Sequence, residues 1–158
     1  MSDLPEFAWK PGAGGWTFGK AGSLGNLAQP KAMILFHGQT PAKGLSMHPP
    51  RVGYARVCYD LARRAQTLDA KVCLSEDDKQ VRPNPTHFEV FGDGKVLWRS
   101  PPLRTYGEAS GFTDRDVSQV NVLELRTYVD AGDDLGSHAV WVNPFVVVKQ
   151  ETKGVPSR

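Results

Sequence analysis

The sequence predicts an all-β protein, a β-sandwich or jelly roll built from about seven or more short strands. Three observations favour this fold class. Strand-like apolar runs recur along the chain, turn residues separate them about every ten positions, and no segment gives an unambiguous long helix. The 16 glycines and 12 prolines among 158 residues exceed the average share of roughly 12% and fit a fold with many turns.

The N-terminal segment, residues 1–42, is predicted to wrap over a sheet and to contain the first strand. It is rich in glycine, proline and small residues up to Pro30. Met33–Phe36 is a compact apolar run that predicts a buried strand, and His37–Pro41 supplies the turn after it. Isolated aromatic side chains would anchor the wrapping chain to the sheet; they are Trp9, Trp16 and Phe18.

Residues 55–71 have two interpretations. Their apolar side chains recur at helical spacing, and residues 61–70 contain good helix formers. The same side chains also fit the inward faces of two successive strands, and the β-branched and aromatic flanks favour strands. We predict strands and allow a helical turn between Leu61 and Thr67. The apolar residues concerned are Val57, Tyr59, Leu61, Ala65, Leu68, Ala70 and Val72.

A β-hairpin is the clearest local prediction. Phe88–Phe91 and Lys95–Trp98 are strand-like runs around Gly92–Gly94, and Asp-Gly in a two-residue loop accepts the positive φ angles of a type I′ turn. Further on, Val120–Val129 alternates apolar and charged residues, which predicts a half-buried strand. We expect the core to receive Phe88, Val90, Leu123 and Leu125.

The last predicted strand is Ala139–Val148, a run of strong β-propensity that follows the turn-rich loop Asp130–Ser137. Pro144 lies inside this strand. Because proline has no N–H to donate to a sheet, it predicts either an edge position or a bulge.

Charge and composition exclude several function classes. The 19 basic and 17 acidic residues leave a net charge of +2, which is too small for binding to nucleic acid by phosphate neutralisation. No apolar run approaches the about 20 residues of a membrane span, and Met1–Lys10 lacks the features of a signal peptide. Nucleophile elbows, phosphate-binding loops and dinucleotide-binding turns are missing, which argues against an enzyme.

A single domain is expected over residues 1–158, with residues 43–148 as the sandwich core and residues 149–158 as a tail. The two cysteines, Cys58 and Cys73, lack the spacing of a zinc site. One disulfide bridge and two buried free thiols both fit this pair.

Polar side chains near turns are the candidates for a binding site. None of the four histidines has the spacing of a helical zinc site. His138 enters a strand that carries Trp141, and an aromatic face beside a fixed polar group suits the two sides of a sugar ring. His48 precedes two prolines, which would hold it on a stiff loop. Glu76 and Asp77 are candidate acceptors for sugar hydroxyls, or calcium ligands, but a solvated acidic turn is the favoured interpretation of this segment.

Trp141 has two interpretations, as a stacking platform for a sugar or as a core residue. Side chains three positions apart in one strand point to opposite faces. If the strand begins at Ala139, His138 belongs to the loop and can turn toward a ligand. Trp141 is then expected to pack inward and support that loop from beneath.

Several sequence segments occur in the same order as the motifs of a known domain family. Phe88–Trp98 is similar to the pattern F-x-V-x-GDGK-x-L-W/Y, Ser137–Val142 to DHAxWA, and Lys43–His48 to KGIGTHA. Together they resemble the NPCBM/NEW2 domains, carbohydrate-binding modules related to family 51. Ser137 stands where this family tends to have aspartate. The other matching segments are Val57–Leu61, Leu68–Val72 followed by Asp77–Asp78, and Val117–Val120 with Leu123–Leu125.

The resemblance implies a galactose-binding-domain-like jelly roll without catalytic activity. It implies that loops at one edge of the sandwich recognise terminal, galactoside-like sugars of a glycan, with His48, His138 and Trp141 at the matching positions. It also implies an extracellular or cell-surface bacterial protein, other domains of a parent chain as partners, and room for a structural calcium ion. The alternative is a protein-interaction or scaffolding sandwich that has lost its sugar site; a small hydrolase ranks third.

Overall fold

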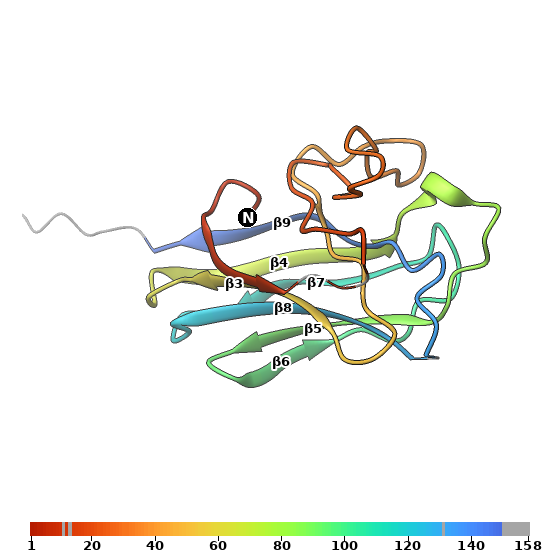
Figure 1. Cartoon of the computed structure of the whole chain (residues 1–158). Helices are drawn as coiled ribbons and strands as arrows, with labels where there is room; N and C mark the ends of the chain where they lie inside the picture. Colours follow the sequence, from red (N-terminus) through yellow and green to blue (C-terminus); the bar gives the residue numbers. More distant parts are fainter. Residues whose placement is uncertain (11, 13, 131, 150–158) are drawn as a thin grey trace, which may run out of the picture.

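The protein is a sandwich of two antiparallel β-sheets (Figure 1), seen here in a computed structural model that describes residues 1–10, 12, 14–130 and 132–149. One sheet has five strands in the order β1-β3-β8-β5-β6, and the other has four in the order β2-β9-β4-β7. The strands are β1 (Glu6–Lys10), β2 (Leu45–Ser46), β3 (Ala55–Asp60), β4 (Ala65–Leu74), β5 (Thr86–Gly92), β6 (Lys95–Arg99), β7 (Ala109–Asp116), β8 (Val122–Val129) and β9 (Ala139–Val148).

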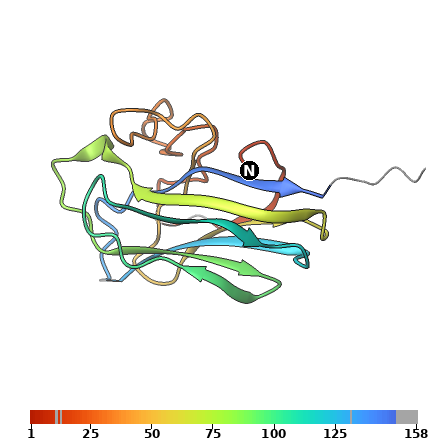
Figure 2. The ribbon, with the colours of Figure 1, turned by 180° about the vertical axis from the view of Figure 1, so that it is seen from behind.

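The predicted all-β fold class is confirmed. The one helical element in the described residues is a 3-10 turn, η1 (Glu76–Asp78). No helix in this part of the chain is long and apolar enough to cross a membrane. Figure 2, seen from behind, shows the four-stranded sheet lying over the five-stranded one.

The ambiguous residues 55–71 form two strands, as predicted, but no helical turn joins them. Ala62 and Arg63 have φ angles of 44° and 58°, and the Arg64 amide donates to the Leu61 carbonyl over 2.8 Å. These left-handed angles make a tight turn that carries the chain from β3 in one sheet to β4 in the other. The alternation of buried and exposed side chains along two strands therefore decides the structure of these residues, and their helical spacing does not.

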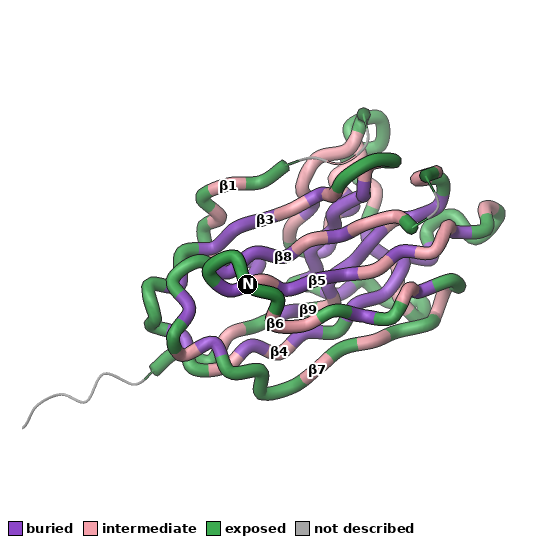
Figure 3. Tube along the Cα trace, turned by 90° about the horizontal axis from the view of Figure 1, so that it is seen from below, coloured by how far each residue is buried: buried purple, intermediate pink, exposed green. Residues whose placement is uncertain are grey.

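Side chains from the facing sides of both sheets form one core. All four residues predicted to face inward, Phe88, Val90, Leu123 and Leu125, have no exposed surface. Trp141 is the largest fully buried residue, and its ring meets the Phe88 ring edge to face at 5.5 Å between centroids. Figure 3 shows the buried residues gathered along the middle of the strands.

The predicted hairpin is confirmed as β5–β6. Asp93 and Gly94 have φ angles of 48° and 78°, as a type I′ turn requires. The Asp93 carboxylate also accepts hydrogen bonds from the amides of Asn121 and Val122, at 3.1 and 2.9 Å. These contacts tie the tip of the hairpin to the start of β8 and hold the pKa of Asp93 below its usual value.

Pro144 marks a bulge in β9, and the edge alternative is wrong because β9 lies between β2 and β4. The register shifts from Lys71↔Val142 to Asp69↔Phe145, and Asn143 takes a φ of 45° to accommodate the extra residue.

The N-terminal chain wraps over a sheet, as predicted, but Met33–Phe36 is not a strand. Met33 and Phe36 make only isolated bridges, to Ser23 and Gln39, and the first strand is β1, which pairs with β3. The wrapping segment (residues 14–44) lies on the outer face of β4 and β9 (orange in Figure 1). A second small core seals it there, formed by Leu24, Ile34, Cys73 and Val140.

The two cysteines are both buried free thiols. Cys58 alternates in β3 with the core residues Val57 and Tyr59, so its side chain lies on the outer face of the five-stranded sheet. Cys73 belongs to the small core under the wrapping segment, on the opposite side of the sandwich. The disulfide alternative is therefore wrong for this fold.

We expect Trp141→Ala to lower the free energy of unfolding by about 3–5 kcal/mol, because the substitution leaves a cavity in the core. Phe145→Ala, in the same strand but at a residue that is 51% exposed, should cost less than about 1 kcal/mol. Chemical denaturation followed by circular dichroism measures both. Equal costs for the two variants would contradict the inward placement of Trp141.

Candidate binding site at the edge of the sandwich

The pairing of β2 with β9 brings His48 and His138 together. Leu45 and Ser46 pair with Trp141 and Val140, and the Met47 amide donates to the Ala139 carbonyl over 3.0 Å. One further step along this antiparallel register sets His48 opposite His138. Their rings meet edge to face, 5.2 Å between centroids. The two histidines predicted for the site therefore converge although 90 residues separate them in the chain.

The end of β4 delivers Asp77 to the same place. Leu74 pairs with Ala139, the Ser75 amide donates to the His138 carbonyl, and η1 then turns Asp77 toward the imidazole. His138 Nδ1 lies 2.8 Å from Asp77 Oδ2. Burial opposes the ionised form of Asp77, but the hydrogen bond and charge of His138, and a hydrogen bond from Ser75, hold its pKa below the usual value.

An ionised Asp77 fixes the role of His138. A carboxylate only accepts hydrogen bonds, so Nδ1 of His138 must carry the proton that it donates. In the neutral ring Nε2 is then an acceptor, which suits a sugar hydroxyl. The His138 side chain is 13% exposed, so the ring is held in place but still reaches the surface.

Trp16 from the wrapping segment covers both histidines. Its ring stacks on His48 at 4.6 Å and 15°, and lies tilted against His138 at 4.5 Å. Trp16 itself is half-buried. Sequence reasoning identified Trp16 only as an anchor for the wrapping chain. Its position after two glycines, where the backbone is free to present a ring, was the available signal.

His48 is kept neutral by its surroundings. It is 5% exposed, its Nδ1 has no hydrogen-bond partner, and its Nε2 lies 3.6 Å from Asp134. Burial lowers the pKa of His48 to about 4, and the neighbouring His138 adds to this effect, while Asp134 and Asp77 oppose it. Asp134 is in turn bound by Arg51 over 3.1 Å. Neither Asp134 nor Arg51 was identified from the sequence.

The remaining predicted site residues lie elsewhere. Glu76 is 8% exposed and turns toward the wrapping segment, where it accepts from the Gly38 amide at 3.4 Å and pairs with Lys79. Trp141 is fully buried, so it lies beneath the site without reaching the surface. This is the inward placement that the sequence favoured over stacking on a sugar.

One small hollow borders the site at His48. The hollow that His48 lines with Thr17 and Phe18 has no room for a water molecule. In the described part of the chain, no group of three or more His, Cys, Asp and Glu side chains is placed to hold a metal ion. Glu76 and Asp77, considered above as possible calcium ligands, are therefore not part of such a group.

Comparison of the fold with solved structures gives its class. At 17% identity and a TM-score of 0.71, the chain is similar to "CBM51 from Clostridium perfringens GH95 in complex with methyl-galactose", covering 92% of this chain and 97% of that one. It is also similar, at 18% identity and a TM-score of 0.74, to "CBM51-2 in complex with GlcNAc" with the INT domains of Clostridium perfringens ZmpB, covering 93% of this chain and 31% of that one. These likenesses show that the chain shares the two-sheet sandwich fold of these modules.

A longer neighbour contains the same fold as one part. The structure of the M60 catalytic domain with CBM51-1 and CBM51-2 of Clostridium perfringens ZmpB is 20% identical with a TM-score of 0.75, covering 95% of this chain and 15% of that one. No curated protein sequence matches the chain. The NPCBM/NEW2 domain model matches residues 1–147. The chain belongs to the NPCBM/NEW2 domain family.

We expect acid to destabilise the fold through His48. The unfolded histidine binds a proton near pH 6.5, whereas the folded one resists protonation down to about pH 4. Stability is therefore complete above pH 6.5 and is lost as the pH falls toward 4. Between pH 7 and pH 5 this amounts to about 2 kcal/mol.

Urea denaturation of the wild type and of His48→Gln at pH 7, 6 and 5 measures this dependence. The variant should lose much less stability over the same interval, since its amide does not titrate. Parallel loss in both proteins would assign the acid sensitivity to other groups.

Proposed function

We propose that this chain is a non-catalytic module that binds the terminal sugar of a glycan at the edge site of His138, Asp77 and Trp16. The convergence of His48 and His138, with Asp77 fixing the His138 ring, is the observation that carries the proposal. Trp16 supplies the aromatic surface for the sugar, the role for which the sequence analysis considered Trp141. Membership of the NPCBM/NEW2 family supports a carbohydrate ligand.

The groups at the edge site match the two sides of a pyranose ring. Asp77 accepts from hydroxyls, Nε2 of His138 accepts from them when the ring is neutral, and the indole of Trp16 can contact the apolar C–H face. His48 stays neutral and stacked under Trp16, where it supports the indole. A galactoside is the first sugar to test, because a module of this fold is solved with methyl-galactose; GlcNAc, seen with another, is the second.

Modest affinity follows from the shape of the site. The hollow at His48 has no room for a sugar ring, so a ligand bound at the edge site keeps much of its surface in water, and its bound hydroxyls must give up well-ordered water. Such a module gains useful strength when it is repeated or attached to other domains, because linked sites act together. We therefore propose that the chain serves other domains of a longer, extracellular protein, by bringing them to glycans.

We expect His138→Ala to abolish sugar binding in a protein that stays folded. Its stability should fall by about 1–3 kcal/mol, because the ring is only 13% exposed, packs against Trp16 and His48, and is the hydrogen-bond partner of Asp77. Calorimetric titration of the wild type and the variant with methyl-galactose, and then with GlcNAc, measures this. The matched control is His87→Ala, which removes another Asp-bound imidazole (2.6 Å from Asp130) on the five-stranded sheet. Binding retained in His138→Ala but lost in His87→Ala would place the sugar elsewhere.

A protein-interaction role is the second candidate, and β1 favours it. This edge strand exposes two large aromatic side chains, Phe7 at 58% and Trp9 at 45%. If the folded wild-type protein binds no sugar on a broad glycan array, the protein-interaction role is favoured over sugar binding.

A further inference from the structure

A hollow away from the edge site lies on the outer face of the four-stranded sheet. This groove encloses about 590 Å³ and is lined by residues of β4, β7 and β9. Its volume falls within the roughly 300–1,000 Å³ of small-ligand sites. A second hollow of about 170 Å³ extends it beneath residues 36–42 of the wrapping segment, and the two share Val142 and Asn143.

Small residues create the groove. Gly111 of β7 pairs with Lys71 of β4, and Ala109 pairs with Cys73, so this side of the sheet has little to cover its outer face. A side chain at Gly111 would meet the Ala70 carbonyl at 2.4 Å, so the close approach of the two strands keeps this position bare. The wrapping segment stops at the rim, where the Lys43 amide donates to Asn143 Oδ1 over 2.8 Å.

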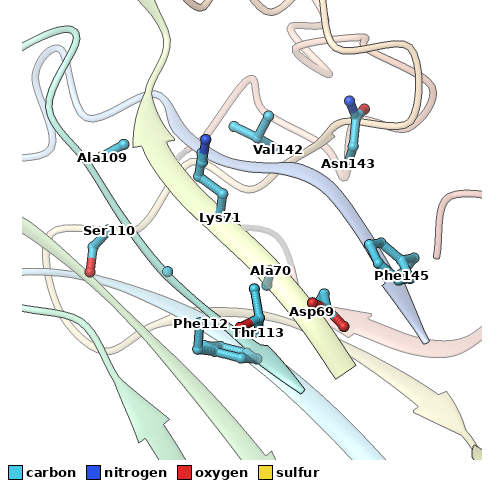
Figure 4. A pocket seen from close by; sticks show the side chains of 11 residues that line it. Asp69, Ala70, Lys71, Ala109, Ser110, Phe112, Thr113, Val142, Asn143 and Phe145 are labelled. Carbon is cyan, nitrogen blue, oxygen red and sulfur yellow. The ribbon is translucent and has the colours of Figure 1, made fainter. Parts of the chain in front are cut away.

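Polar and apolar groups line the groove together. Figure 4 shows Lys71 between Ala109 and Val142, with Asp69, Thr113 and Phe145 toward the other end. Phe145 is 51% exposed, although it is a large aromatic residue in a long, well-paired strand. The bulge at Asn143 and Pro144 shifts the register and places Phe145 beside Asp69 on this outer face. An apolar ring thus stands next to hydrogen-bonding groups.

Asp69 and Lys71 decide the charge of the ligand. They are two positions apart in β4, so their side chains lie on the same face, and neither forms an ion pair within the described residues. An anion would meet Lys71 but be repelled by Asp69, and a cation the reverse. Hydroxyl groups both donate and accept, so a neutral polyhydroxyl compound satisfies the carboxylate and the ammonium at once.

We propose that this groove is a second carbohydrate site, which binds internal pyranose units of a neutral oligosaccharide. Phe145 stacks on the C–H face of one ring, while Asp69 accepts from hydroxyls and Lys71 donates to them. The continuation under residues 36–42 gives room for a neighbouring unit. The chain then holds one glycan end at the edge site and a stretch of glycan along the sheet.

A titration followed by ¹H–¹⁵N NMR tests this with four neutral linear probes: cellotetraose, β-1,4-galactotetraose, mannotetraose and xylotetraose. At least one should shift the amides of residues 69–71, 110–113 and 142–145. Phe145→Ala should weaken that binding about tenfold or more, because a central aromatic anchor carries a large share of the energy. Lys71→Met and Asp69→Asn should each weaken it as well.

Two controls separate this site from the others. Phe7→Ala removes an exposed aromatic side chain outside the groove and should leave the titration unchanged. His138→Ala should abolish binding of methyl-galactose but keep the tetrasaccharide shifts in the groove, so the two sites can fail independently.

Three outcomes would overturn the proposal. In the first, none of the four probes moves the groove amides of the folded protein. In the second, Phe145→Ala binds as tightly as the wild type. In the third, the groove amides shift with protein concentration alone and sedimentation shows a dimer that Phe145→Ala dissociates, which would make a second copy of the chain the occupant.

Discussion

The pairing of β9 with β2 on one side and β4 on the other is the constraint on which the rest of the structure depends. Its register buries Trp141 at the centre of the core, against Phe88. The same register, continued one residue before the strand, sets His138 opposite His48 and beside the end of β4, from which Asp77 arrives. Core and edge site are therefore two results of one set of backbone hydrogen bonds, and a slip of one residue would exchange inward and outward side chains along the whole strand.

The wrapping segment gives the edge site its aromatic surface, but it also buries the polar His48 side chain, which costs stability. Trp16 reaches the histidines because the small core of Leu24, Ile34, Cys73 and Val140 holds the segment on the sheet. Its ring and the surrounding chain bury His48 with Nδ1 unpartnered, and this burial lowers the pKa of His48 to about 4. A neutral, stacked imidazole is a firm support for an indole, whereas a charged one would have to draw water into the cluster.

The outer face of the four-stranded sheet is divided by where the wrapping segment ends. Under the segment, Cys73 and Val140 are sealed from water. Beyond it, the same strands leave the groove of Lys71, Asp69 and Phe145 open. The bulge in β9 decides this division, since it reverses the alternation of side chains after Asn143 and exposes Phe145 on the side that the wrapping chain does not reach.

The sequence by itself determined the elements whose signals are local. The hairpin at Asp93–Gly94, the last strand Ala139–Val148 and the inward faces of the strands at Phe88 and Leu125 follow from turn chemistry and period-two alternation. The bulge at Pro144 was one of two alternatives, the other being an edge strand. The missing N–H of proline can be read from the sequence, but the position of its strand in the sheet cannot. The order of motifs also identified the family.

Only the tertiary structure decided which side chains meet. Sequence reasoning proposed His48, His138 and Asp77 but grouped them with Glu76 and Trp141, since neighbours in the chain give no sign of the direction in which a turn sends each side chain. It identified Trp16 only as an anchor and did not identify Asp134 and Arg51, because these three residues come from separate loops. It took Met33–Phe36 for a strand, although the run has no partner strand and only Ile34 and Phe36 pack in the small core. Contacts between distant segments depend on sheet order and register, and local residue preferences do not encode either one.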